Sequence, residues 1–235
     1  MIASPIRYKR HHFPAELITH AVWLYLRFPL SLRLVEEMRL ERGIVVSYET
    51  RRWAAKFGPA ITRNLRRRAP RPGDISRLDE VRIVIRGAVH WLWRAVDQHG
   101  VVLDEILQRR RNTRAAKRLL VRLLKRQGWT PCRIVTDKLP SYGAAKREIA
   151  PCIEHRSHKG LNNRAENAHV PLPKRERQMQ GFRSPGGLQR FTSTFSAVRN
   201  LFVPPADKRQ ALSTHLHRLQ AFAHWRSAAG MTVAL

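Results

Sequence analysis

Acidic residues are scarce in this sequence of 235 residues, where 17 Asp and Glu stand against 45 Lys and Arg and leave a formal net charge of +28. A compact protein with this excess of positive charge needs a polyanionic partner, because Lys and Arg bound to phosphates release condensed counterions. We therefore expect nucleic acid binding that weakens steeply as salt rises. Charge alone does not separate an enzyme acting on DNA from a passive binder such as a ribosomal protein.

Cysteine and long apolar runs are also scarce. Two cysteines, Cys132 and Cys152, are too few for a disulfide framework or a tetrahedral thiolate metal site, which suits a reducing cytoplasm. No run approaches the roughly 20 apolar residues of a membrane span, and no apolar targeting segment follows the N-terminal charges. The apolar fraction of 43% is ordinary for a globular core. We expect a folded protein of the cytoplasm, associated with the nucleoid and not with a membrane.

The first quarter of the chain has the periodicity of short helices. Ser31 is placed to cap the second helix and Gly43 to end it, while Ser47 is placed to cap a third helix over residues 48–58. Helix, glycine turn and basic helix form the outline of a helix-turn-helix, whose second helix enters the major groove of DNA.

Arg51 and Arg52 begin this basic helix and are the expected DNA contacts. We predict a helix-turn-helix DNA-binding region over residues 1–62, although any small three-helix bundle shares the outline. Residues 63–75 combine arginines with two prolines and a glycine, which predicts a basic linker.

From Ser76 the pattern changes to that of strands. VRIVIRG alternates, HWLWRAVD follows at once, and a turn at Asp97 precedes VVLDEILQ, so three strands in a meander are expected. Asn112 can cap a leucine-striped helix that Gly128 ends, and RIVTD, SYGAAKREIA and LNNRAENAH predict a strand and two further helices. Trp91 and Trp93 fit the core and the sheet face better than a base-stacking surface.

This β-β-β-α-β-α order brings carboxylates from the first strand, the end of the fourth strand and a later helix to one sheet edge in the RNase H-like fold. Asp79, Asp137 and Glu166 stand at those places. Phosphodiester chemistry uses two Mg²⁺ ions about 4 Å apart, and Mg²⁺ prefers carboxylate oxygens. Spacing alone is weak evidence, since ten acidic residues lie between positions 74 and 166.

The motifs RLDEVRIVIRG, WLWRAVDQHGVVLDEILQRRRN, RIVTDKLPSYGAAKREI and LNNRAENAH resemble, in order and content, the acidic-triad (DDE) transposases of small bacterial insertion sequences. The resemblance is nearest to the insertion sequence six family and runs from about Phe13 to about Trp225. It implies an α/β (α+β) fold, in which an RNase H-like mixed sheet with flanking helices occupies residues 76–180 after the small all-α domain. Basic, amphipathic helices over 181–235 would contact DNA ends or a second protomer.

The resemblance also implies a site and its partners. The metal ligands would be Asp79, Asp137 and Glu166, holding two Mg²⁺ ions that Mn²⁺ can replace. The DNA contacts beyond the N-terminal region would be Lys138, Arg164 and His169, although His169 is as readily interpreted as a packed or solvated histidine. Double-stranded DNA, as terminal inverted repeats and target, would be bound by a homodimer.

The other carboxylates have plainer interpretations. Glu80 alternates to the strand face opposite Asp79 and is expected at the surface. Asp97 is interpreted as a turn former, and Asp104 and Glu105 as exposed strand residues.

The expected activity is metal-dependent 3′-end nicking and strand transfer of an insertion sequence. One alternative is an RNase H-like nuclease or resolvase that cuts without joining. Another is an inactive DNA-binding remnant, because Thr50 runs directly into Arg51 where relatives carry one more residue, and because Pro173 is expected to disrupt the helix beyond Glu166.

Overall fold

The computed structural model describes residues 6–46, 48–67, 74–204 and 210–231. The chain divides into two compact units, one formed by Met1–Ala69, Lys174–Gln180 and Ser193–Leu235 and the other by Pro70–Pro173 and Gly181–Thr192. These units cut across the predicted boundaries, since the segment predicted to start at residue 181 contributes to both. Because each unit draws on separate stretches of sequence, a division by consecutive ranges could not describe them.

The first unit is helical, with α1 (Ala15–Arg27), α2 (Leu32–Leu40), α3 (Glu49–Arg67) and α9 (Ala211–Ala228). The Ser31 side chain accepts a hydrogen bond from the backbone N–H of Leu34, and Gly43 follows α2 with φ +70°, so both predicted ends of this helix are confirmed. The predicted cap at Ser47 lies outside the described residues. No helix in the described part of the chain is both long and apolar enough to cross a membrane.

Helix α3 is longer than the sequence pattern predicts. It continues through Pro59 to Arg67, so residues 63–67 are helical and the prediction that the linker begins at 63 is wrong. The reason is a buried stripe that continues past the proline and comprises Trp53, Phe57, Ile61 and Leu65. The remaining linker residues 68–73 lie outside the described part of the chain.

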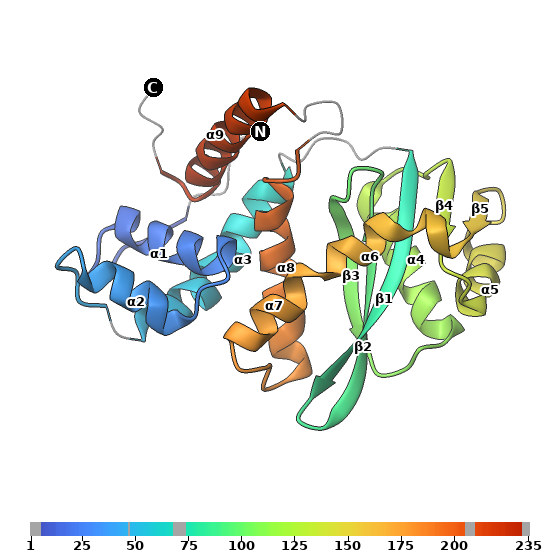
Figure 1. Ribbon diagram of the computed structural model, residues 1–235, viewed down its shortest axis with the longest axis horizontal. Helices are drawn as coiled ribbons and strands as arrows, with labels where there is room; N and C mark the ends of the chain where they lie inside the picture. Colours follow the sequence, from blue (N-terminus) through green and yellow to red (C-terminus); the bar gives the residue numbers. More distant parts are fainter. Residues whose placement is uncertain (1–5, 47, 68–73, 205–209, 232–235) are drawn as a thin grey trace. The chain divides into compact units, whose positions relative to one another are not determined.

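The second unit contains a five-stranded mixed sheet in the order β3-β2-β1-β4-β5 (Figure 1). The strands are β1 (Ile75–Ile85), β2 (Ala88–Val96), β3 (Val102–Gln108), β4 (Arg133–Thr136) and β5 (Glu154–Ser157). The pairs β1–β2 and β2–β3 are antiparallel, and the pairs β1–β4 and β4–β5 are parallel. The predicted meander and mixed sheet are confirmed, with β5 as an additional strand.

One face of this sheet is covered by α4 (Thr113–Gln127) and α5 (Pro140–Ile149). Their shared core contains Leu78, Trp93, Leu119, Leu120 and Tyr142, which confirms that the leucine stripe and Trp93 are core residues. The Asn112 side chain caps α4, and Gly128 ends it with φ +65°, both as predicted.

The opposite face carries α6 (Asn163–His169), which follows the short helix η1 (Lys159–Leu161). Ala165 and Ala168 pack there against Val96 and Val102. Helix α6 ends at His169, and α7 (Pro171–Gln178) begins two residues later, so the helix beyond Glu166 is interrupted before Pro173 is reached. The prediction that Pro173 disrupts this helix is wrong, because Pro173 lies in the first turn of α7, where its missing N–H is tolerated. Helix α8 (Pro185–Asn200) follows.

Candidate active site

Asp79 and Asp137 come together because β1 and β4 are parallel neighbours. Leu78 pairs with Thr136 across the two strands, so the residue that follows each of them is an aspartate at the same sheet position. The Asp137 carboxylate also accepts a hydrogen bond from the backbone N–H of Leu139 at 3.0 Å, which fixes it as the chain turns into α5. The two predicted carboxylates therefore form the centre of one site.

Glu80 is the third member of this group, and its predicted surface position is wrong. Carboxylate oxygens of Asp79, Glu80 and Asp137 all lie within 4.8 Å of one another. Glu80 does point to the opposite strand face, but α4 and α5 cover that face, and the residue is only 8% exposed. Alternation along a strand predicts which face a side chain occupies and not whether that face meets solvent.

Two partners from distant parts of the chain stabilise Glu80. The buried Tyr142 hydroxyl donates a hydrogen bond to Glu80 Oε2 at 2.6 Å, and Arg111 forms an ion pair with Glu80 Oε1 at 2.6 Å. The same guanidinium lies 3.6 Å from Asp137 Oδ2 and over the Trp91 ring. Arg111 therefore bridges Glu80 and Asp137 and offsets part of their negative charge. Neither partner could be found from spacing, because Arg111 lies 31 residues and Tyr142 lies 62 residues from Glu80 in the sequence.

Glu166 lies outside the 4.8 Å group, on the exposed side of α6. Its charge nevertheless reaches the site, because it contributes to raising the pKa of Asp79. The sequence-predicted trio thus consists of two adjacent carboxylates and a third that is further away on a separate helix.

Burial and crowding make the ionised forms of Asp79 and Glu80 unfavourable, as the raised pKa of each shows. Burial, followed by the charges of Glu80 and Asp137, raises the pKa of Asp79 from 3.8 to about 7. Burial also raises the pKa of Glu80, against the opposing hydrogen bonds from Tyr142 and Arg111. Carboxylate oxygens that lie close together and repel one another fit Mg²⁺ or Mn²⁺, which prefer hard oxygen ligands. The residues present therefore suit a divalent metal site.

A buried ion pair holds α6 to the sheet beside Asp79. Arg94 lies directly across from Asp79 on β2 and pairs with Glu105 on β3 at 2.9 Å, with both side chains almost fully buried. The Arg94 guanidinium also donates to the backbone carbonyl of Ala168 at the end of α6. His169 completes the contact, with Nε2 3.4 Å from Asp79 Oδ2.

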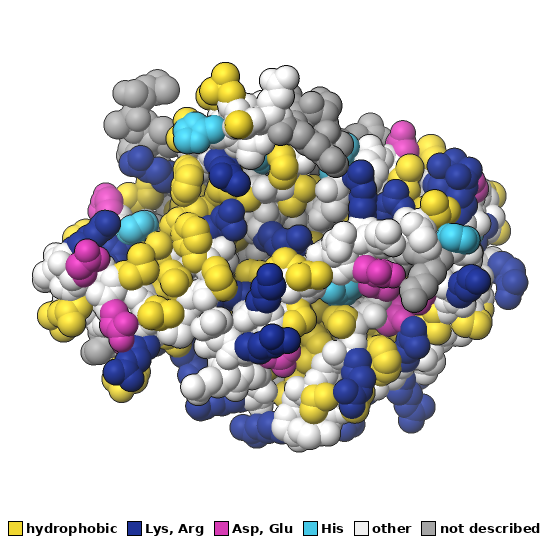
Figure 2. Space-filling view, viewed as in Figure 1, with side chains coloured by type: hydrophobic (Ala, Val, Ile, Leu, Met, Phe, Trp, Pro, Cys, Tyr) yellow, Lys and Arg dark blue, Asp and Glu magenta, His cyan; other side chains and the backbone are white. Residues whose placement is uncertain are grey.

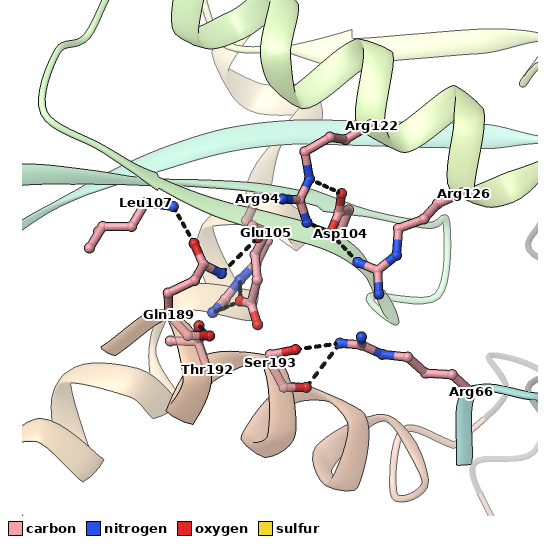
Figure 3. Close-up of polar contacts among 10 residues, drawn as sticks. All are labelled: Arg66, Arg94, Asp104, Glu105, Leu107, Arg122, Arg126, Gln189, Thr192 and Ser193. Atoms are coloured by element: carbon pink, nitrogen blue, oxygen red, sulfur yellow. Dashed lines mark hydrogen bonds and ion pairs between the residues drawn. The ribbon is translucent and has the colours of Figure 1, made fainter. Parts of the chain in front are cut away.

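Asp104 and Glu105 are both buried, so their predicted exposure is wrong. Figure 3 shows Arg94 beside Glu105 and two arginines of α4 beside Asp104. Arg122 contacts Asp104 at 3.1 Å and Arg126 contacts its other oxygen. These arginines supply the compensating charges that make burial of the carboxylates tolerable. Asp97, by contrast, accepts backbone hydrogen bonds from His99 and Val101, which confirms it as a turn former.

The predicted DNA contacts occupy different environments. Arg51 and Arg52 are exposed near the start of α3, where Arg52 pairs with Glu49 at 2.8 Å. Lys138 is exposed directly after Asp137, and Arg164 is exposed on α6 and donates to the backbone carbonyl of Gln98. His169 is buried beside Asp79, as in the packed alternative.

Known proteins resemble this chain over most of its length. Residues 74–203 match a family model described as a DDE domain, of the IS240 transposase type. The transposase for insertion sequence-like element IS431mec of Staphylococcus aureus is 32% identical over 180 residues, which cover 74% of this chain and 79% of that protein. The transposase for insertion sequence element IS257 in transposon Tn4003, also of Staphylococcus aureus, has the same identity and coverage.

A likeness to a solved structure is more distant. A simian T-cell lymphotropic virus intasome, in complex with the PP2A regulatory subunit B56 gamma, contains a chain that is 18% identical with a TM-score of 0.46. The alignment covers 64% of this chain and 56% of that chain.

Proposed function

The chain belongs to the DDE transposases of bacterial insertion sequences, in the insertion sequence six group, and from that premise we propose that Asp79, Asp137 and Glu166 hold its catalytic metal ions. The reaction is cleavage at the element's 3′ ends and their direct transfer to target DNA. One observation carries the assignment of the site: carboxylate oxygens of Asp79, Glu80 and Asp137 crowd within 4.8 Å of one another at the sheet edge.

Divalent metal ions at this site would activate the attacking oxygen and stabilise the leaving oxygen of the phosphodiester. We propose that the site binds two Mg²⁺ ions, which Mn²⁺ can replace. Asp79 and Asp137 supply fixed oxygen ligands, and Glu166 adds a third from α6. No covalent intermediate with the protein is required, because the DNA hydroxyl or water attacks phosphorus directly.

Glu80 acts through its neighbours in this proposal. Its hydrogen bond from Tyr142 and its ion pair with Arg111 hold it in the core, and Arg111 in turn contacts Asp137. We therefore assign Glu80 and Arg111 to positioning Asp137. Arg94 has the corresponding role for α6, since it binds the last turn of the helix that carries Glu166.

Double-stranded DNA is the proposed substrate, as the terminal inverted repeats of the element and as target. Lys138, Arg164 and His169 are proposed contacts near the carboxylates. Arg51 and Arg52 on α3 are proposed to read the terminal repeats in a helix-turn-helix manner, within a DNA-binding region over 1–62. We further propose a homodimer on DNA, which holds two element ends at once, and association with the nucleoid.

Strand transfer by the purified protein tests this function. A labelled duplex carrying the element end is incubated with Mg²⁺ and plasmid target, beside the Asp137→Asn variant and a matched Asp97→Asn variant. We expect cleaved and joined products with the parental protein and with Asp97→Asn, whose amide oxygen can still accept the backbone hydrogen bonds of the turn. Asp137→Asn should give at least a hundredfold less product. Cleavage without joining would indicate a nuclease or resolvase, and DNA binding without either product would indicate an inactive remnant.

A further inference from the structure

An open hollow with three arginines lies at the end of the sheet beyond the carboxylates. Its volume is about 690 Å³, and its walls are the β1–β2 turn, the end of β3 and the segment that begins α8. Arg86, Arg109 and Arg183 line it and are exposed, and no acidic residue is among the lining residues. The hollow lies within the second unit.

These three arginines differ from six others in the same unit that are neutralised. The paired arginines are Arg94, Arg111, Arg122, Arg126, Arg133 and Arg156. Over residues 6–46, 48–67, 74–204 and 210–231, no carboxylate forms an ion pair with Arg86, Arg109 or Arg183. Three cations around one hollow repel one another, and an anion bound between them would relieve that repulsion.

Arg86 occupies a backbone position that favours other residues. It forms the two-residue β1–β2 turn with Gly87, at φ +49° and +76°, between the paired residues Ile85 and Ala88. Asn, Asp or Gly is preferred at the first position of such a turn, and a side chain like that of arginine costs about 1 kcal/mol there. An arginine at this strained position suits a binding role for its side chain.

The remaining walls suit a sugar-phosphate backbone. Ile85 and Leu107 supply apolar surface. His90 also lines the hollow and is only 5% exposed, with Nδ1 3.1 Å from the carbonyl of Ala88, so its other ring nitrogen remains for a ligand. Apolar surface beneath a cationic rim matches deoxyribose carbon atoms beside phosphate oxygens.

We propose that this hollow binds the phosphodiester backbone of the DNA substrate at a second position, separate from the phosphate that is cleaved. The inference rests on the proposed function for its ligand. Asp79 and Ile85 lie on one strand, six residues apart, which is about 20 Å at roughly 3.4 Å per residue. With about 3.4 Å per base pair, a duplex that runs along β1 would place the bound phosphate about six base pairs from the cleavage position. It belongs either to the element end or to the DNA joined to it.

Salt-dependent DNA binding tests the site. Equilibrium binding of a labelled element-end duplex is measured by fluorescence anisotropy between 50 and 300 mM salt for Arg86→Ala, Arg109→Ala and Arg183→Ala, all in the Asp137→Asn background to prevent cleavage. Arg82→Ala is the matched control, because Arg82 is exposed on β1 and points to the other sheet face. We expect the slope of log affinity against log salt to lose about 0.9 for each phosphate contact removed, with affinity five- to tenfold lower near 0.1 M salt. Arg82→Ala should keep the parental slope.

Duplex length identifies the source of the phosphate. One series is shortened towards the cleavage position from the element side and another from the flanking side. In one of the two series, the loss of DNA affinity in Arg86→Ala, Arg109→Ala and Arg183→Ala relative to the parental protein should vanish once fewer than about six base pairs remain on that side. The proposal is overturned if all four variants share the parental slope, or if Arg82→Ala loses as much as the others. Failure of the proposed function would appear in the strand-transfer experiment, as DNA cleavage that persists in the Asp137→Asn variant.

Discussion

At Asp79 the proposed metal site opposes the stability of the folded protein. Its folded pKa of about 7 lies above the unfolded value near 3.8, so the folded state binds the proton more tightly. The free energy of unfolding therefore falls as pH rises from about 4 to about 7, and the loss persists above pH 7. Without metal ions, the ionised site is a source of instability at the pH at which it would work.

Replacing Asp79 by Asn should thus stabilise the metal-free protein, by an amount that grows as pH rises from about 4 to about 7. We expect Asp79→Asn to raise the apparent melting temperature by about 5 °C at pH 8, which corresponds to about 2 kcal/mol, and to change it little at pH 4. Differential scanning fluorimetry in chelator measures both. An equal shift at the two pH values would mean that the carboxylate's charge is not the cause.

Glu80 and Tyr142 should be coupled energetically. Glu80→Ala leaves the buried Tyr142 hydroxyl without its acceptor, which should destabilise the protein by about 2 kcal/mol. In the Glu80→Ala background, Tyr142→Phe should then cost less than it does alone. A double-mutant cycle by chemical denaturation measures this coupling. Strictly additive losses would show that the 2.6 Å contact contributes nothing beyond packing.

At the scale of elements, those with a strong period or defined ends could be predicted from sequence. Strand β1 follows from its alternation, and α4 follows from Asn112 and Gly128 at its ends. Strand β5 could not be found, because Glu154–Ser157 has no apolar alternation and is fixed by pairing with β4. Helix α3 extends beyond its predicted end at residue 58, because burial further along the helix outweighs the local breaker Pro59.

Part of the candidate site could be predicted from sequence. The order of elements along the chain follows from its pattern, and the RNase H-like fold that this order indicates places Asp79 and Asp137 at neighbouring strands, which β1 and β4 are. Burial of Glu80, Asp104 and Glu105 depends on arginines and a tyrosine from distant segments, which no local pattern reveals.

Arg94 should fix the position of helix α6 in addition to stabilising the folded protein. Arg94→Leu alone leaves Glu105 buried without a counter-charge and should cost about 3 to 5 kcal/mol. Combining it with Glu105→Leu should restore most of the stability, since an apolar pair can replace a buried ion pair. The double variant still lacks the donor to the Ala168 carbonyl, so we expect its DNA cleavage rate to stay about tenfold low.

Melting temperature and cleavage rate, measured on the same samples, separate the two effects. Arg122→Ala is the control, because Arg122 pairs with Asp104 on the other face of β3 and Arg126 remains as a partner. Full recovery of cleavage together with stability in the double variant would assign Arg94 a purely structural role.

Across the whole molecule, positive charge is spread widely and negative charge is sparse. Figure 2 shows Lys and Arg in dark blue at many places on the visible face, with fewer Asp and Glu in magenta. The +28 charge favours contact with phosphates at many places, while three carboxylates gather where metal ions are proposed. The proposed chemistry thus depends on a small acidic site within a basic protein.

The excess charge gives a direct expectation for binding by the intact chain. Affinity for an element-end duplex should fall by about a thousandfold or more between 50 and 200 mM salt, as for proteins with six to ten phosphate contacts. Electrophoretic mobility shifts across this range measure the fall. An affinity that hardly changes would mean that apolar or base contacts dominate instead.

Metal binding measures directly whether Asp79, Asp137 and Glu166 form the proposed metal site. Mn²⁺ binding is measured by electron paramagnetic resonance for the parental protein, Asp79→Asn, Asp137→Asn and Glu166→Gln, with Glu154→Gln as an exposed acidic control outside the group. We expect tight Mn²⁺ binding that falls at least tenfold in the Asp79→Asn and Asp137→Asn variants, falls less in Glu166→Gln, and is unchanged in Glu154→Gln. Equal Mn²⁺ affinity in all five proteins would contradict a catalytic site built on these carboxylates.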